Sequence, residues 1–166
     1  EARLRGYDVE ARSKNKFSTE VSYSVEKGWL DKNGLPPNPT HKFTGFDAFK
    51  LGERLADAIS EGERHVIWWK WEKKRSGHII SLRKENGQIK YYDPQSGINY
   101  SQADFDKKIK NQIDLMHGVN TMRVDNLGFN PYYYDETLTS KGGGRVLKGD
   151  LRQTTYEAER EANERV

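Results

Sequence analysis

The residues with the clearest chemical meaning lie in two short segments, Ser76–Ser81 and Tyr91–Gly97, each part of a β-like run. His78 stands near the start of the first run and Asp93 at the end of the second. A turn joins the runs, and an antiparallel hairpin brings the start of one strand beside the end of the next. We therefore expect His78 and Asp93 to lie together, as a general base and the carboxylate that orients it must.

The missing member of this arrangement is the nucleophile. A base–carboxylate pair usually serves a Cys or a Ser, and the chain contains no Cys. Gly77 would let a substrate backbone come close to the histidine. Each residue also has a structural reading, since a strand His is often structural and Asp93 could simply cap an Asp-Pro turn. Gln95 could be a plain turn residue, or an amide that holds the imidazole or an oxyanion.

Aromatic and basic residues flank the pair. Trp69 and Trp71 alternate along the strand that precedes His78, so they could contact substrate together with Gly77, or could pack in the core. The run Lys73–Arg75 is typical of a solvated turn, with a phosphate-binding patch as the alternative.

Composition bounds the remaining possibilities. The 166 residues suit one domain, and the formal charge of +3 with a pI of about 9.0 permits nucleic-acid binding without arguing for it. His41, His65 and His117 have no neighbours at metal-ligand spacing. The sequence has no Gly-rich phosphate loop and no apolar run of transmembrane length. We therefore expect no metal, no cofactor and no membrane partner.

The strands that position the pair are predicted from alternating apolar residues. Asn86-Gly87 between two such runs is the strongest hairpin signal in the chain. Bulky apolar residues lie on both faces of Arg64–Glu72, which indicates a central strand. The expected strands are Tyr7–Ala11, Arg64–Glu72, Gly77–Lys84, Gln88–Tyr92 and Thr121–Leu127.

Two helices are expected beside this sheet. One spans Phe46–Glu61, with Thr44 as its candidate cap, and the other spans Gln102–Met116, with Ser101 as N-cap. The stripes predicted to face the core are Phe46, Phe49, Leu55 and Ile59 on the first helix, and Phe105, Ile109, Ile113 and Met116 on the second.

The two ends of the chain read differently from this middle part. Glu1–Arg5 is typical of the end of a helix that Gly6 stops. Residues 12–45 are predicted to be a long loop rich in breakers. Residues 136–166 are interpreted as a Gly-rich linker and a charged tail that could be helical.

Three segments, in this order, resemble the papain-fold toxin domains of bacterial polymorphic toxins, the glutamine deamidase group. They are Arg3–Ala11, Gly77–Ile80 and Tyr91–Gly97, with Val124–Asn126 as a weaker echo. The resemblance implies an α+β, papain-like cysteine protease/deamidase fold over residues 1–135, with an antiparallel sheet packed on helices and a truncated first helix. It also implies a nucleophilic Cys on that helix, upstream of Glu1, with His78 as base and Asp93 as the orienting carboxylate.

The resemblance further implies an effector (toxin) domain at the C-terminus of a secreted or phage-associated bacterial protein used in bacterial competition. Its expected reaction is hydrolysis of an amide, with deamidation of a protein glutamine first and proteolysis second. Its expected partners are a target protein in the cytoplasm of the recipient cell and an acidic cognate immunity protein. Without a Cys, the chain by itself is expected to be inactive.

Two other functions stay open at this point. The chain could be an inert papain-like binding module, which the missing Cys favours. It could instead be a nucleic-acid-binding or nuclease toxin, which only the pI and Lys73–Arg75 favour, so nucleic acid is not the expected partner.

Overall fold

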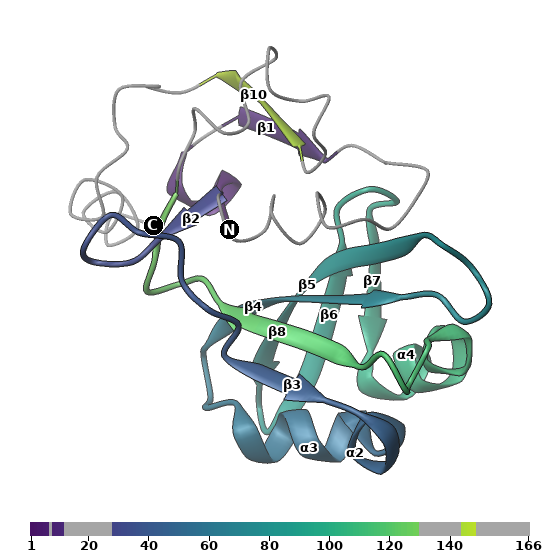
Figure 1. Ribbon diagram of the computed structural model, residues 1–166. Coiled ribbons are helices and arrows are strands. Elements are labelled where there is room, and N and C mark those ends of the chain that lie inside the picture. Colours follow the sequence, from purple (N-terminus) through teal and green to yellow (C-terminus); the bar gives the residue numbers. More distant parts are fainter. Residues whose placement is uncertain (7, 12–27, 130–143, 149–166) are drawn as a thin grey trace. The chain divides into compact units, whose positions relative to one another are not determined.

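The computed structural model describes residues 1–6, 8–11, 28–129 and 144–148 (Figure 1). The chain divides into two compact units. One consists of Glu1–Asn38 with Val124–Val166, and the other is the continuous segment Pro39–Arg123. The positions of the units relative to one another are not determined, so each is described by itself. No helix among the described residues has the length and apolar character needed to cross a membrane.

The unit Pro39–Arg123 is built on a six-stranded sheet whose paired strands are all antiparallel. The spatial order is β3-β8-β4-β5-β6-β7, so β4 is central, as predicted, and β3 and β7 form the edges (Figure 1). Three of the four strands expected in this unit are confirmed. The fourth, expected over Thr121–Leu127, instead starts at Val119 and ends at Arg123, and β3 and β7 are not predicted from the sequence. The strands are β3 (His41–Phe43), β4 (Arg64–Lys70), β5 (Gly77–Glu85), β6 (Gln88–Asp93), β7 (Ile98–Ser101) and β8 (Val119–Arg123).

The hairpin of β5 and β6 has the predicted turn. Asn86 and Gly87 both have positive φ, of 53° and 75°, which the two central residues of a type I′ turn require. The turn fixes the register, so that Leu82 lies opposite Tyr91. Continuing this register places Asp93 opposite Ile80 and diagonal to His78.

Short helices cover one face of this sheet. They are α2 (Gly45–Phe49), α3 (Leu51–Ala58) and α4 (Gln102–Lys108), and the 3₁₀ turn η2 (Lys110–Gln112) follows α4. Ser101 caps α4 as predicted, since its hydroxyl accepts a hydrogen bond from the Asp104 amide at 3.1 Å. The helices and the sheet share one core, made of Ala48, Leu51, Leu55, Ile59, Ile67, Trp69, Ile80, Leu82, Ile89, Tyr91, Phe105, Ile113 and Val119.

The prediction of one continuous helix over Phe46–Glu61 is wrong. The chain leaves helical geometry at Lys50, where ψ is 31°, and the second helix begins at Leu51. This break rotates the buried face, so Phe46 and Phe49 are 66% and 55% exposed while Leu51 is fully buried. Thr44 makes no side-chain cap.

The second predicted helix also ends early. It stops at Lys108, and Met116, expected in its core stripe, lies beyond both helical turns and is 81% exposed. Phe105 and Ile113 are buried as expected, and Ile109 packs partly against the core.

The other unit contains two small antiparallel strand pairs. One pair joins β1 (Asp8–Ala11) to β10 (Gly144–Lys148), and the other joins β2 (Trp29–Leu30) to β9 (Gly128–Phe129). Strand β10 lies within residues 136–166, which were predicted to be a linker and a tail. The strand is not predicted because the glycines at 142–144 indicate a loop and because its partner strand is distant in the sequence. The remainder of the tail lies outside the described residues.

The N-terminal residues of this unit are fixed by Arg5. Residues Arg3–Arg5 form a 3₁₀ turn (η1), and Gly6 ends it in the left-handed conformation with φ of 93°, as predicted. The buried Arg5 side chain donates to the Val124 carbonyl oxygen at 2.8 Å and pairs with Glu1 at 3.1 Å. Two segments that carry the family resemblance therefore meet in this unit.

Candidate active site

The His78–Asp93 pair forms as the hairpin register predicts. The distance between His78 Nε2 and Asp93 Oδ2 is 2.7 Å, and both side chains are largely buried, at 18% and 11% exposure. Both lie on the core face of the sheet, because every second residue of a strand points to the same face. His78 shares its face with the core residues Ile80 and Leu82, and Asp93 shares its face with Tyr91. The geometric prediction is confirmed, whereas the catalytic roles of the two residues stay predictions.

This geometry selects a tautomer of His78. A carboxylate only accepts hydrogen bonds, so Nε2 carries a proton and donates a hydrogen bond to Asp93. Nδ1 is then the basic nitrogen, and it makes no hydrogen bond within the described part of the chain. The imidazole can therefore take a proton at Nδ1 while Asp93 holds its opposite edge.

Asp93 is held in place by the turn that follows β6. Its second carboxylate oxygen, Oδ1, accepts a hydrogen bond from the Gln95 backbone amide at 2.9 Å. Its carbonyl oxygen accepts from the Gly97 amide at 2.8 Å, and Gly97 has a φ of 73° that favours glycine. Gln95 thus orients the carboxylate through its backbone, while its predicted oxyanion role stays untested.

Two indole rings contact the His78 imidazole. The Trp71 ring stacks on it with centroids 5.9 Å apart and planes 20° apart, and the Trp69 ring meets it edge-on at 5.8 Å. Trp69 is 1% exposed and also packs against Phe105, so its predicted contact with substrate does not fit its burial. Trp71 and Gly77 are half-buried, and their substrate-binding roles stay predictions.

The turn between β4 and β5 is solvated, as predicted. Lys73, Lys74 and Arg75 are all exposed. Within the described ranges, no three His, Asp or Glu side chains gather as a metal ion would require. His65 instead is buried beside Glu63, with Nε2 3.0 Å from a carboxylate oxygen.

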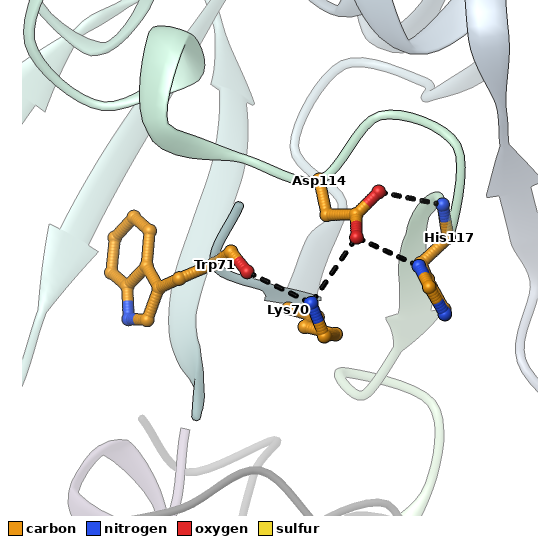
Figure 2. Close-up of polar contacts among 4 residues, drawn as sticks. All are labelled: Lys70, Trp71, Asp114 and His117. Carbon is orange, nitrogen blue, oxygen red and sulfur yellow. Dashed lines mark hydrogen bonds and ion pairs between the residues drawn. The ribbon is translucent and has the colours of Figure 1, made fainter. Parts of the chain in front are cut away.

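A second His–Asp contact, which is not predicted from the sequence, lies in the loop before β8. Asp114 accepts hydrogen bonds from the His117 amide at 3.1 Å and from its ring Nδ1 at 2.7 Å, and pairs with Lys70 at 3.2 Å (Figure 2). The His117 amide, with Lys70 and the His117 ring, lowers the pKa of Asp114 to about 2. The spacing Asp-x-x-His in a loop was the available signal.

A partly buried carboxyl group in helix α4, Asp106, is also not predicted from the sequence. Burial raises the pKa of Asp106, although Lys110 lies 3.9 Å away and acts in the opposite direction. Burial, with the charge of Asp106, likewise raises the pKa of Tyr91. In the described part of the chain, neither the Tyr91 hydroxyl nor Asp106 Oδ1 has a hydrogen-bond partner.

Comparison with known protein families supplies the assignment. Residues 2–98 match the model of the family described as "Papain fold toxin 1, glutamine deamidase". The chain belongs to this family. Its fold is papain-like, with an antiparallel sheet and short helices in an α+β arrangement. The matched residues include Arg3–Ala11, His78 and Asp93, and the chain lacks a cysteine.

Comparison with solved structures gave a partial match to the avirulence protein AvrPphB of Pseudomonas. The sequences are 24% identical over 52% of this chain and 50% of that protein, with a TM-score of 0.37. The match thus spans half the length of AvrPphB. A search of curated proteins gave no match.

Proposed function

We propose that the domain is the effector part of a toxin that deamidates a protein glutamine by a Cys-His-Asp mechanism, with the Cys outside the 166 residues. The observation that carries this proposal is the 2.7 Å contact between His78 Nε2 and Asp93 Oδ2, which leaves Nδ1 as the basic nitrogen. Membership of the glutamine deamidase family supports the choice of reaction.

In this mechanism, His78 Nδ1 takes the thiol proton and the thiolate attacks the amide carbonyl carbon. The tetrahedral intermediate collapses to a thioester as the C–N bond breaks, and His78 returns the proton to the departing ammonia. Water then attacks the thioester, giving up one proton to His78, which passes it to the released thiolate. The product is a glutamate side chain, and Asp93 holds the imidazolium throughout.

The test is to express the chain in bacteria together with the residues that precede Glu1 in its gene. We expect toxicity that His78→Ala lowers about 100-fold or more, because the thiol then lacks its base. Asp93→Ala should lower it less, since orientation is lost but the base remains. Mass spectrometry of cellular proteins should show glutamines converted to glutamates, whereas new chain termini would indicate proteolysis.

The control is a variant of the exposed turn, Lys73→Ala with Lys74→Ala, which should remain toxic. The absence of any Cys in the preceding residues, or toxicity that survives His78→Ala, would contradict the proposal.

A binding module without chemistry is the second candidate, because the chain itself contains no cysteine. This candidate requires that the complete protein bind its target equally well with His78→Ala and with the native residue.

We also propose, from family membership, that the domain acts in the cytoplasm of a recipient cell and is neutralised in the producer by an acidic immunity protein.

A further inference from the structure

The end of strand β4 is clamped to the loop that precedes β8. The Lys70 carbonyl oxygen accepts a hydrogen bond from the Asp114 amide at 2.9 Å, and the Glu72 amide donates to the Gln112 carbonyl at 2.7 Å. Between these two contacts, Trp71 forms an isolated antiparallel bridge with Ile113. The loop thus follows the backbone on both sides of Trp71.

Side chains strengthen the clamp on one side. The Lys70 ammonium lies 3.2 Å from Asp114 Oδ2 and 3.2 Å from the Trp71 carbonyl oxygen, so it donates to both (Figure 2). The two side chains of this ion pair are only 21% and 17% exposed, and His117 fixes the carboxylate from the other side. A partly buried pair with several charge-assisted hydrogen bonds restricts its neighbours more than an exposed pair does.

The indole of Trp71 points away from this ion pair (Figure 2). Along a strand, successive side chains alternate between faces, so Trp69 and Trp71 face the core side while Lys70 faces the other. On the core side, the Trp71 ring stacks on the His78 imidazole at 5.9 Å and meets the Trp69 ring at 5.4 Å. Contacts that fix the Trp71 backbone therefore also fix the position of the indole that stacks on the imidazole.

We propose that Lys70 and Asp114 are positioning residues for His78, acting through Trp71. The ion pair holds the Trp71 carbonyl, the Trp71 ring limits rotation of the imidazole, and the Nε2–Asp93 hydrogen bond keeps its alignment. This inference rests on the proposed function of His78 as the base, but the geometry that it predicts can be measured in the Cys-free chain.

The experiment is NMR spectroscopy of the four histidine rings in the complete 166-residue chain, with His78 assigned by His78→Gln. Stacking on an indole shields the imidazole protons, so Trp71→Leu should move the His78 ring signals downfield. Asp114→Asn and Lys70→Met should move them in the same direction, by an appreciable part of that shift. They should also speed exchange of the Nε2–H proton with water.

Two controls separate positioning from general effects. Lys74→Met removes a neighbouring exposed ammonium that makes no hydrogen bond or ion pair within the described part of the chain, and should leave the His78 signals unmoved. His117→Ala removes the ring partner of Asp114 but keeps Lys70 and the backbone amide of residue 117, so it should move the signals less than Lys70→Met does. Loss of stability alone does not shift the signals of molecules that remain folded.

The proposal is overturned if the His78 signals of folded Asp114→Asn and Lys70→Met coincide with those of the native chain, or if Trp71→Leu does not move them. Should Asp114→Asn fail to fold, Lys70→Met decides, because it leaves the Asp114 turn with His117 intact. A toxin assay that contradicts the role of His78 as base would not alter these signals, so the two proposals fail separately.

Discussion

At the scale of single residues, the two oxygens of Asp93 have different tasks. Oδ1 accepts from the Gln95 amide and Oδ2 accepts from His78. An asparagine has only one carbonyl oxygen to offer. If that oxygen stays on the Gln95 amide, the NH₂ group faces His78 and donates to Nε2.

We therefore predict that Asp93→Asn reverses the tautomer of His78, placing the proton on Nδ1, so that Nδ1 is no longer the basic nitrogen. Imidazole ¹⁵N chemical shifts near neutral pH report the tautomer directly. Asp93→Ala serves as the comparison, because it removes the partner without imposing the other tautomer. An Nε2–H tautomer in Asp93→Asn would contradict the prediction.

Asp114 and Asp106, both in the unit Pro39–Arg123, should make the stability of the fold depend on pH with opposite signs. The pKa of Asp114 is lowered to about 2, so Asp114 contributes stability above its ordinary value of 3.8 and loses it as the pH falls toward 2. Burial raises the pKa of Asp106, so ionising Asp106 opposes folding, and stability falls as the pH rises above 3.8.

Near pH 7, Asp114→Asn should accordingly lower the melting temperature, and Asp106→Asn should raise it. The Asp106→Asn difference should disappear as the pH falls below 3.8, where that carboxyl is protonated in both folded and unfolded chains. The Asp114→Asn difference should persist at 3.8 and shrink only toward pH 2. Thermal melts of the two variants across this range would test the assignment, and equal signs at neutral pH would refute it.

At the scale of elements, the loop from η2 to β8 depends on Gly118. Its φ of 89° is in the left-handed region, and a Cβ there would lie 2.8 Å from the Phe43 carbonyl oxygen of β3. Gly87 in the β5–β6 turn has a similar φ of 75°, with no atom within 4 Å of a Cβ.

Gly87→Ala should cost only the left-handed conformation, roughly 1–2 kcal/mol of unfolding free energy. Gly118→Ala should cost this and an additional steric term of about 1–3 kcal/mol, because the Phe43 backbone carbonyl is in the way as well as the Thr44 methyl group. Urea unfolding of the two variants measures the difference. Equal losses would mean that β3 moves aside at little cost.

Comparison of the elements with their sequence signals shows what local reasoning captures. Asn86-Gly87 fixed the hairpin, and the hairpin alone brought His78 to Asp93, so the core of the candidate site was predictable. The helix break at Lys50 was not, because Phe46 and Phe49 satisfy a helical period that the folded chain does not bury. The period of apolar residues reports a helix but not which side is covered.

Contacts between distant segments were out of reach for a similar reason. The Lys70–Asp114 ion pair joins a strand to a loop 44 residues later, and no sequence pattern predicts this contact. Strand β10 is not predicted because the glycines before it indicate a loop. Residues of this kind are identified only when the topology places them together. The role of Arg5 was likewise invisible, because its partner is a backbone carbonyl at Val124.

At the scale of the whole molecule, the charge argues against nucleic acid as the partner. The net charge is only +3, and many of the described cations lie in ion pairs. A protein that neutralises few phosphates releases few counterions, so it gains little affinity for nucleic acid from this source. We predict no measurable binding of DNA or RNA by the 166-residue chain at physiological ionic strength.

Fluorescence anisotropy with labelled single- and double-stranded oligonucleotides would test this prediction. Binding that persists at this salt and is abolished by Lys73→Ala with Lys74→Ala would instead support the nuclease alternative.

The pairing of β1 with β10 has a consequence for the order in which the protein can form. A ribosome makes β1 early, but its partner, Gly144–Lys148, emerges only after all of Pro39–Arg123 has been synthesised. The six-stranded sheet that contains His78 and Asp93 can therefore complete its pairing before β10 has been synthesised, while β1 is still unpaired. A chain cut before Gly144 would keep the base and its carboxylate, yet leave the Arg5 segment next to an unpaired strand.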